Sequence, residues 1–560
     1  MALSLVDRDG SQTVPPAAGR RRSRRWFLPL VVAALLAEMA FAMVSTAVAQ
    51  SPTTDEPVYV GTAVVYMQQH SLRYNAEHPP LGKLIMEAGL WFGHPRLDPA
   101  FVGDHWALGR RVLFESGNDA QRLMLLARLP VIVLTLLFGL VVFAFARDLT
   151  GNAGAVLALA LYAFSPDLIT HGSLATLDVP AAGFLLTAVW LLWRARQRPV
   201  RYLAPAGLAL GAALATRMSV LPAVPVLLLL AVLSYWHSAG PGDGSGRLSA
   251  RPGRLRRGLA AAAGVAAIAV AVVWVSYLAV DPQLRWTPTD VPVIHGLRGL
   301  VTNLLPLPEA YRDGMRIQLG FEQNRWGGFL FGRQYEGSLW YYLPVALLVK
   351  TPLGMLALWI AGVATLLSVR RLRPAAPYLL VPAAMLMAAA MSGARDFGTR
   401  YVIFLPMFLA VAAATVVTLR PRWARLAAAA LVVFVAVSSV RTYPYYLPYS
   451  NEAFGGPSKT YLRLHDSNSD WGQDLARVAD RLREGYPGQH VWLVYKGGSD
   501  PAYYGIDSSF PLDLPPDRVH GLLVVSNDAI DKADARLTAL IATSTPLEQV
   551  GHSITVFRRP

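Results

Sequence analysis

The sequence predicts a polytopic α-helical membrane protein that carries a small α/β domain at its C-terminal end. Of its 560 residues, 54% are hydrophobic and only 16% are charged, and the mean hydropathy is +0.37. This composition is too apolar for a soluble protein of such length and is typical of repeated membrane spans. The apolar residues gather in long stretches as far as Arg441, after which the composition changes.

About eleven apolar stretches could cross a bilayer as helices. Because the shortest have about 15 to 17 residues against the ~20 normally needed, the expected number of spans is eleven, give or take one or two. The stretches run at about 26–49, 123–146, 152–170, 179–195, 202–216, 218–236, 258–280, 352–369, 376–392, 401–418 and 423–440.

The arginine-rich segments between these stretches all fall on one side of the membrane if every stretch spans. They are Arg20–Arg25, Arg194–Arg201, Arg247–Arg257, Arg370–Arg373 and Arg420–Arg425. The positive-inside rule makes that side cytoplasmic. The formal net charge of +15 is therefore explained by topology, and no nucleic-acid partner is expected. The outer side then holds loops of about 50–122 and 281–337, and everything from residue 442 onwards.

The N-terminal end has two interpretations. Residues 20–50 combine a basic start, an apolar run and an Ala-Val-Ala ending, as a cleaved signal peptide does. The apolar run has about 23 residues, which exceeds the ~7–15 of a signal and favours a retained span. Residues 1–25 are expected to form a disordered cytoplasmic N-terminus, and "HSAGPGDGSGRLSARPGR" a flexible cytoplasmic loop.

Residues 442–560 are expected to form an extracytoplasmic α/β domain. Asp470 is predicted to cap a helix, with Gln473 at the capping-box position. "HVWLVY" (490–495), "GLLVVS" (521–526) and "SITVF" (553–557) are predicted strands, and residues 529–541 a second helix.

Ionisable residues from distant parts of the chain share one depth, the outer headgroup level. Ionisable groups at the membrane boundary usually mark function. Two carboxylates with a ring of cations suit an anionic lipid whose phosphate carries a group to be transferred. The cations would stabilise the phosphate, and a carboxylate would activate an incoming hydroxyl. The residues at this depth are Asp55, Glu56, Glu77, His78, Lys83, Asp178, Arg217 and Arg400.

Taken singly, each of these residues also has a structural interpretation. "LGKLIMEAGLWF", after Pro79-Pro80, is expected to be an amphipathic interfacial helix from which Lys83 snorkels. For the others, the alternatives are solvated loop carboxylates (Asp55, Glu56), a helix N-cap (Asp178) and interfacial anchors (Arg217, Arg400). The shared depth favours the functional interpretation.

Several motifs resemble one known family. "DEP" after the first span, "EHPPLGK", "LDVP" and "TRYVIFLPMFL" are similar to motifs of the membrane-embedded GT-C glycosyltransferases. The nearest branch is the protein O-mannosyltransferase and aminoarabinose-transferase superfamily, glycosyltransferase family 39 and relatives. "YEGSLWYYLPVALLVKTPLG", "DSNSDWGQDL" and "DPAYYGI" resemble a bacterial subgroup of phospholipid-carrier-dependent glycosyltransferases in the cell envelope.

The resemblance implies a GT-C fold and roles for particular residues. The family's catalytic acid in the first outer loop corresponds to Asp55, with Glu56 beside it, and the second acid to Asp178. Glu77 and His78 occupy the place of a Glu-Lys pair in the aminoarabinose transferases, so Glu77 is given a supporting role towards acceptor or donor. Contacts to the lipid phosphate are assigned to His78, Lys83, Arg217 and Arg400.

The expected activity is inverting transfer of a hexosyl or pentosyl group from a polyprenyl-phosphate sugar to an acceptor hydroxyl, as in protein O-mannosylation. No large sugar-binding insertion is present between the later spans, so the acceptor stays open between protein, lipid and cell-wall glycan. A lipid-linked sugar transporter or flippase is the alternative from another class, and it predicts polar residues and broken helices at mid-bilayer.

Besides donor and acceptor, the expected partners are membrane lipids. The scheme requires no cofactor and no metal, and no His/Asp cluster has clear ligand spacing. Since the chain has no cysteine, disulfides and thiolate metal sites are excluded.

The first prediction concerns topology. A reporter fused after Pro560 should report the extracytoplasmic side, and one inserted near Gly242 the cytoplasm, because the basic loops flank the second position. An inward C-terminus in this fusion assay would contradict the placing of Asp55 and Asp178 on the outer side.

Overall fold

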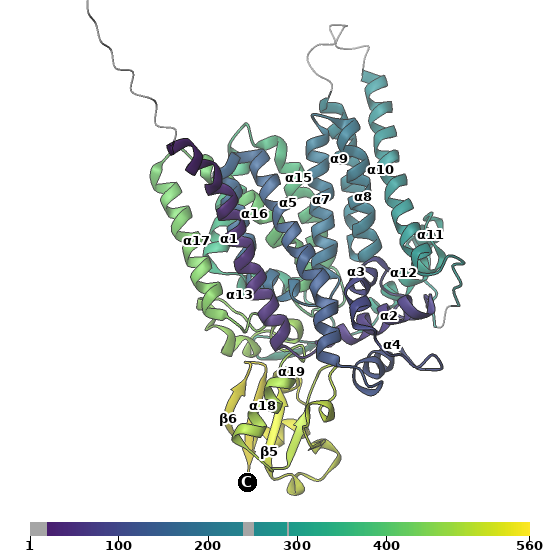
Figure 1. Ribbon diagram of the computed structural model, residues 1–560, viewed down its shortest axis with the longest axis vertical. Coiled ribbons are helices and arrows are strands. Elements are labelled where there is room, and N and C mark those ends of the chain that lie inside the picture. Colours follow the sequence, from purple (N-terminus) through teal and green to yellow (C-terminus); the bar gives the residue numbers. More distant parts are fainter. Residues whose placement is uncertain (1–18, 239–250, 288–289) are drawn as a thin grey trace, which may run out of the picture.

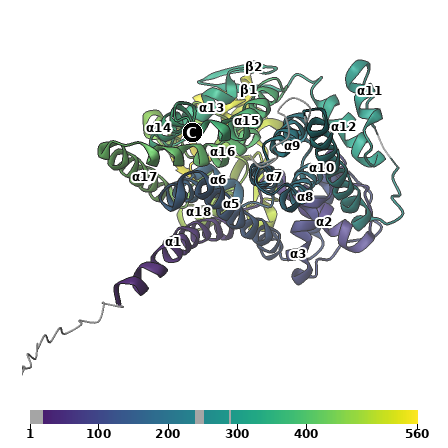
Figure 2. The same cartoon turned by 90° about the horizontal axis from the view of Figure 1, so that it is seen from above.

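The computed structural model describes residues 19–238, 251–287 and 290–560. The helices form an elongated bundle, and a small α/β unit lies against one end of it (Figure 1). Viewed from above, α8, α9 and α10 lie on one side and α13 to α17 on the other, with α5 and α7 between them (Figure 2). The end of α9 and the start of α10 lie at the far end of the bundle from the α/β unit, as the predicted topology requires (Figure 1).

Every predicted apolar stretch falls on helical structure. Among the described residues, six helical segments are long and apolar enough to span alone, and a seventh is added if α13 and α14, bent by 118°, make one span. The chain is thus a multi-pass membrane protein, and the count of eleven stays a prediction. The helices of the bundle are α1 (Gly19–Ala49), α5 (Ala120–Ala163), α6 (Pro166–Gly172), α7 (Asp178–Ala195), α8 (Pro199–Thr216), α9 (Val224–Ser238), α10 (Arg251–Val280), α13 (Tyr342–Lys350), α14 (Leu353–Ser368), α15 (Ala376–Met391), α16 (Phe404–Ala413) and α17 (Arg422–Thr442).

Helix α5 contains two antiparallel halves. Gly151 has φ +78°, a left-handed value that glycine adopts at little cost, and it breaks the helix there. The Tyr162 hydroxyl donates to the carbonyl of Thr135 at 2.7 Å, which a straight helix would not allow over this sequence separation. The predicted stretches 123–146 and 152–170 are therefore separate helical segments.

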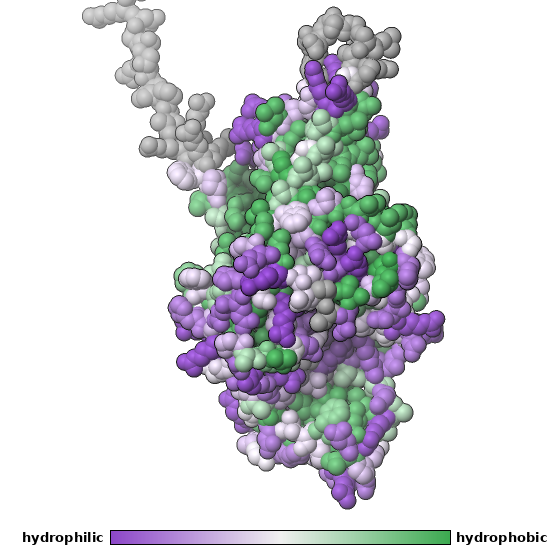
Figure 3. Space-filling model, turned by 90° about the vertical axis from the view of Figure 1, so that its right-hand side faces the viewer, coloured by the Kyte–Doolittle hydropathy of each residue, from purple (hydrophilic) through white to green (hydrophobic). Residues whose placement is uncertain are grey.

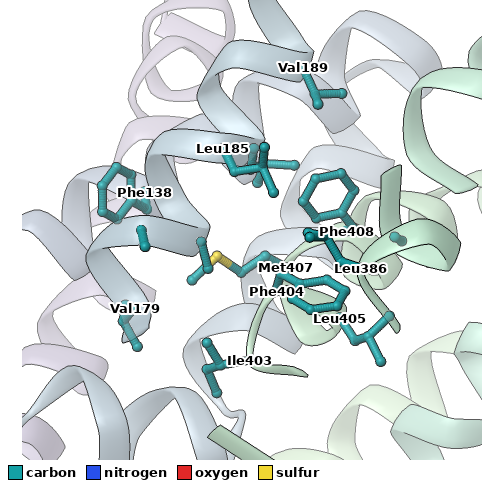
Figure 4. Close-up of a cluster of buried hydrophobic side chains, with 14 of the residues drawn as sticks. Phe138, Val179, Leu185, Val189, Leu386, Ile403, Phe404, Leu405, Met407 and Phe408 are labelled. Atoms are coloured by element: carbon teal, nitrogen blue, oxygen red, sulfur yellow. The ribbon is translucent and has the colours of Figure 1, made fainter. Parts of the chain in front are cut away.

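Small residues allow helices to approach closely within the bundle. Gly207 and Gly211 of α8 face α10, where a Cβ on either would lie under 3.0 Å from Ile268 or Val272. This spacing of glycines is a common packing device between membrane helices. Larger side chains of α5, α7, α15 and α16 fill the interior, with Phe138, Leu185, Met407 and Phe408 among those in contact (Figure 4).

The loops at the end of the bundle that adjoins the α/β unit contain short helices and a hairpin, and polar side chains gather over this part of the surface below an apolar belt (Figure 3). The predicted amphipathic helix is present as α3, followed by a 3₁₀ turn at Trp91–Gly93. These elements are α2 (Glu56–Gln69), α3 (Leu81–Leu90), α4 (His105–Arg110), α11 (Gly296–Leu304), α12 (Glu309–Phe321), β1 (Gly327–Leu330) and β2 (Arg333–Glu336).

The C-terminal unit is a five-stranded sheet in the order β4-β3-β5-β7-β6. Strand β3 pairs in parallel with β4 and β5, while β7 runs antiparallel to both β5 and β6. The three predicted strands are present, and β4 and β6 were not expected. The elements are α18 (Leu475–Gly485), β3 (Val491–Val494), β4 (Ser508–Ser509), β5 (Gly521–Ser526), α19 (Asn527–Asp531), α20 (Ala535–Ala542), β6 (Thr545–Val550) and β7 (Ile554–Arg559).

Two sequence predictions about this unit were wrong. Helix α18 begins at Leu475 with Asp474 at its N-cap, so Asp470 does not cap it. The carboxylate of Asp470 accepts instead from the amides of Gly472 and Asp528. The helix expected at 529–541 is divided into α19 and α20, because Asp534 caps a new helix start. Most of the predicted disordered N-terminus and of the predicted flexible loop lies outside the described residues.

Candidate active site

The structure brings Asp55 and Arg400 together from positions 345 residues apart. Asp55 immediately precedes α2, and Arg400 lies in the short turn that leads into α16. An Arg400 Nη1 atom donates to Asp55 Oδ2 at 2.6 Å, and 20% of the Asp55 side chain stays exposed. The guanidinium also lies over the ring of Trp471, at 4.4 Å from its centroid. The group of ionisable residues predicted at one depth, here called the rim, therefore contains a carboxylate that is paired with a guanidinium and partly exposed.

Glu56 has a different environment from its neighbour. Its side chain is fully buried, and Arg128 donates to both of its oxygens at 2.7 and 2.6 Å. The amides of Thr53 and Ala175 also donate to it, at 2.8 and 2.7 Å. With its oxygens occupied and out of solvent, Glu56 is placed to hold the loop that carries Asp55.

Arg128 was missed in the sequence. It is fully buried, and besides Glu56 it donates to the carbonyls of Ala47, Gln50 and Ser51 at the end of α1. A single arginine inside an otherwise apolar predicted span was the available signal, because such a charge needs a partner.

Asp178 and Arg217 form a second buried ion pair at the rim. Asp178 is the first residue of α7, with Leu177 in the N-cap position, so it is not the cap. Arg217 follows the end of α8 and is 11% exposed, and its carboxylate partner is 2% exposed. The guanidinium of Arg217 lies 5.6 Å from the centroid of the Tyr401 ring, next to Arg400 in the chain. The structure thus joins these two predicted residues to the same rim, and neither is a solvated interfacial anchor.

His78 lies beside this pair as a neutral group. Burial and the nearby cations, Arg217 foremost, lower the pKa of His78 well below its usual value. Its ring packs edge-on against Tyr59, and within the described chain its Nδ1 atom has no hydrogen-bond partner. A neutral imidazole can donate a hydrogen bond to a phosphate but cannot supply positive charge.

Lys83 does not snorkel, and this expectation was wrong. Its ammonium is buried and donates to the carbonyl and side-chain oxygens of Asn75, at 3.0 and 3.1 Å, and to the carbonyl of His78 at 2.7 Å. Burial lowers the pKa of Lys83 to about 7. Glu77 accepts from the Asn75 amide at 2.7 Å and lies 3.8 Å from His105. Lys83 and Glu77 therefore shape the loop that presents His78.

A cluster of ligand-type residues lies where the α/β unit meets the bundle. Atoms of His465, Asp466 and Asp528 that could bind a metal lie within 4.8 Å of one another. The ammonium of Lys496 contacts both carboxylates, and that of Lys532 lies 3.5 Å from Asp528. Although burial opposes the effect, the two carboxylates raise the pKa of Lys496. Since the lysines already provide positive charge, we assign this cluster to an ion-pair network and not to a metal.

An apolar cavity of about 700 Å³ opens beside α10, where Val270 and Trp274 belong to its wall. The indoles of Trp274 and Trp286 belong to its wall and donate to the Pro306 carbonyl and to Asp313. Helix α12 begins in this wall. Its Gly314 packs closely on Ala76, which lies in the loop before His78. The cavity and the charged rim are thus connected through one helix.

Part of the chain matches the model of a known protein family. Residues 32–280 match the family model described as dolichyl-phosphate-mannose-protein mannosyltransferase. The chain resembles the protein mannosyltransferases. This match confirms the resemblance expected from the motifs and includes Asp55, Glu56, His78, Lys83, Asp178 and Arg217, whereas Arg400 and the α/β unit lie beyond it. Among curated proteins, none matches the chain significantly.

Several solved structures contain chains similar to this one. ArnT from Cupriavidus metallidurans bound to undecaprenyl phosphate has 15% identity, covers 95% of this chain and 97% of its own, and has a TM-score of 0.46. The S. cerevisiae Pmt1–Pmt2 complex bound to the sugar donor has 20% identity, covers 46% of this chain and 33% of its own, and has a TM-score of 0.35. Archaeoglobus fulgidus AglB, in complex with an inhibitory peptide and a dolichol-phosphate, has 12% identity, covers 93% and 73%, and has a TM-score of 0.44.

The second prediction tests the buried pair. Arg128→Met leaves the Glu56 carboxylate buried without its cation, so it should lower the free energy of unfolding by about 3–5 kcal/mol. The measurement is thermal unfolding of the purified protein in detergent. Arg122→Met, at an exposed position of the same helix, is the matched control.

The double variant Arg128→Met with Glu56→Gln should recover part of the loss, since no unpaired charge is then buried. If Arg128→Met unfolds at the wild-type temperature, the pair does not hold the Asp55 loop.

Proposed function

We propose that the protein is an inverting glycosyltransferase that moves a sugar from a polyprenyl-phosphate sugar to an acceptor hydroxyl at the extracytoplasmic face of the membrane. The single observation that carries the proposal is the Asp55–Arg400 pair, which places an accessible carboxylate beside a guanidinium. The match of residues 32–280 to the mannosyltransferase model supports the same activity.

Asp55 is the proposed general base. The acceptor hydroxyl gives its proton to the carboxylate as its oxygen attacks the anomeric carbon, through an oxocarbenium-like transition state. The bond from the anomeric carbon to the phosphate oxygen breaks, and the lipid phosphate leaves with the electron pair. Arg400 binds Oδ2, and Oδ1 is left for the acceptor among the described residues.

Arg400 and Arg217 are proposed to stabilise the leaving phosphate, with His78 donating a hydrogen bond. The Arg400 Nε atom is buried and has no hydrogen-bond partner in the described part of the chain, so it can still bind an anion. A positive charge ~4 Å from the developing negative charge contributes about 4 kcal/mol at an effective dielectric of ~20. Asp178 is proposed to orient Arg217, and Glu56 to orient Asp55.

The lipid part of the donor is proposed to enter from the outer leaflet. The cavity beside α10 is lined mainly by apolar side chains and suits an isoprenoid chain, as expected from its volume and from the hydrophobic effect. Protein, lipid and glycan acceptors are all compatible with this mechanism. A transporter is favoured less, because the candidate residues lie at helix ends: Asp55 precedes α2, Asp178 begins α7 and Arg217 follows α8.

The third prediction concerns the base. Asp55→Asn keeps the shape of the side chain but cannot accept a proton at neutral pH, so turnover should fall about 10²–10⁴-fold. The assay is the rate of transfer from labelled polyprenyl-phosphate sugars at saturating donor, with donor binding measured on the same preparations. Asp98→Asn, an exposed carboxylate of the same outer loop, is the control.

Retention of more than about a tenth of the wild-type rate would show that another group is the base. Movement of labelled donor across vesicles with no transfer to any acceptor would instead support the transporter.

The fourth prediction concerns the donor phosphate. Arg400→Ala should weaken binding of polyprenyl phosphate itself at least about tenfold, because hydrogen bonds to a charged group are lost. Arg463→Ala, an outer-side arginine that interacts with Phe454 and the Lys459 carbonyl, should leave this affinity unchanged. If both variants bind polyprenyl phosphate with equal affinity, Arg400 does not bind the phosphate and serves only as the ion-pair partner of Asp55.

A further inference from the structure

Residues 465–473, here called the bridging segment, connect the α/β unit to the candidate active site. The segment follows the bundle helix α17 and directly precedes α18, at the junction of the two parts (Figure 1). Most of its side chains are buried although it contains no long helix or strand. Its buried polar groups must therefore be paired, and their partners show what the segment holds.

One set of partners belongs to the loop that carries Asp55. The carbonyl of Trp471 accepts from the amide of Thr54 at 2.9 Å and from its hydroxyl at 3.2 Å. The amide of Ser51 donates to the carbonyl of Gln473 at 2.9 Å. These bonds end one residue before Asp55, so the bridging segment sets where that carboxylate lies.

A second set of partners belongs to the turn that carries Arg400. The Ser467 hydroxyl donates to the carbonyl of Phe397, and the Asn468 side-chain oxygen accepts from the amide of Thr399 at 3.1 Å. The Trp471 indole covers the Arg400 guanidinium at 4.4 Å. The Trp471 carbonyl thus binds Thr54, the residue before Asp55, and the Trp471 ring covers Arg400.

The sheet in turn fixes the bridging segment. The amide of Asp466 donates to Asp528 Oδ1 at 2.7 Å, and the amide of Asp528 donates to Asp470 Oδ2 at 3.2 Å. Asp528 is in α19, directly after β5. Asp466 has φ +55°, a left-handed conformation that costs energy for a residue with a Cβ and persists where the surroundings impose it.

We infer that Trp471 is a positioning residue that sets Asp55 and Arg400 relative to each other, and that through it the α/β unit is part of the active site. The inference rests on the proposed function for its effect on catalysis, but the positioning itself can be measured without any reaction. It assigns the C-terminal α/β unit a task in forming the site, apart from any task in binding an acceptor.

The fifth prediction compares Trp471→Leu with Trp471→Phe. Loss of the aromatic face over Arg400 should lower kcat about tenfold in the leucine variant, the scale of a desolvated cation–π contact. KM for the donor should stay within about threefold, since the effect acts on alignment of the base and not on lipid binding. The phenylalanine variant keeps an aromatic face and should restore most of the rate. Trp492→Phe, in β3 of the same unit and bonded to the His520 carbonyl, is the matched control.

Hydrogen–deuterium exchange of the full-length protein in detergent supplies the readout that needs no activity. Amides in 51–56 and in 396–401 should exchange faster in Trp471→Leu than in wild type and in Trp492→Phe, because both groups of amides depend on the bridging segment. Unchanged exchange in both regions would overturn the inference, whether or not a donor has been found. If Trp471→Leu does not fold, Thr54→Val, which removes the hydroxyl that donates to the Trp471 carbonyl, takes its place, and unchanged exchange in that variant has the same meaning. A fall in kcat with unchanged exchange would also overturn it, since Trp471 would then act on the substrate directly.

Discussion

A buried ion pair in the apolar interior is the interaction on which the site depends. The guanidinium of Arg128 and the carboxylate of Glu56 are both fully out of solvent. Taking two such charges from water is costly unless each is fully hydrogen-bonded. Here the carbonyls at the end of α1 accept hydrogen bonds from Arg128, and the amides of Thr53 and of Ala175, before α7, donate to Glu56. Three pieces of chain, namely residues 47–56, α5 and the segment before α7, are held around one point, and Asp55 is the neighbour of Glu56 in the sequence.

The same physical rule separates the two adjacent acids into different tasks. Glu56 faces inward, where every oxygen already has a donor, and cannot exchange partners without leaving a buried charge. Asp55 faces the rim, keeps part of its surface exposed and has one cation, Arg400. A carboxylate in that position can accept a proton from an incoming group, and its inward neighbour gives it a fixed backbone.

Parts of the site could be predicted because chemistry and topology restrict where charges can lie. Asp55, Asp178, Arg217 and Arg400 were each placed at the outer rim from the sequence, and the structure pairs them as Asp55 with Arg400 and Asp178 with Arg217. Lys83 was misplaced, because its position in an amphipathic helix suggested a route to water. In the structure a nearby turn offers three oxygens instead, and the ammonium stays buried among them. The bridging segment could not be predicted, since its partners come from Thr54, Thr399 and Asp528, each distant in the chain.

The sequence by itself determined the kind of protein this is. Long apolar stretches must become helices in a bilayer, because their backbone groups have no water to bind, and arginine-rich loops indicate which ends share a side. Local turn signals and alternating apolar residues likewise placed β3, β5 and β7. Only the tertiary structure decided which charges meet. An ion pair or a buried hydrogen bond depends on the distance between side chains, and Asp55 meets Arg400, and Arg400 meets Trp471, only after the distant segments that carry them have packed against one another.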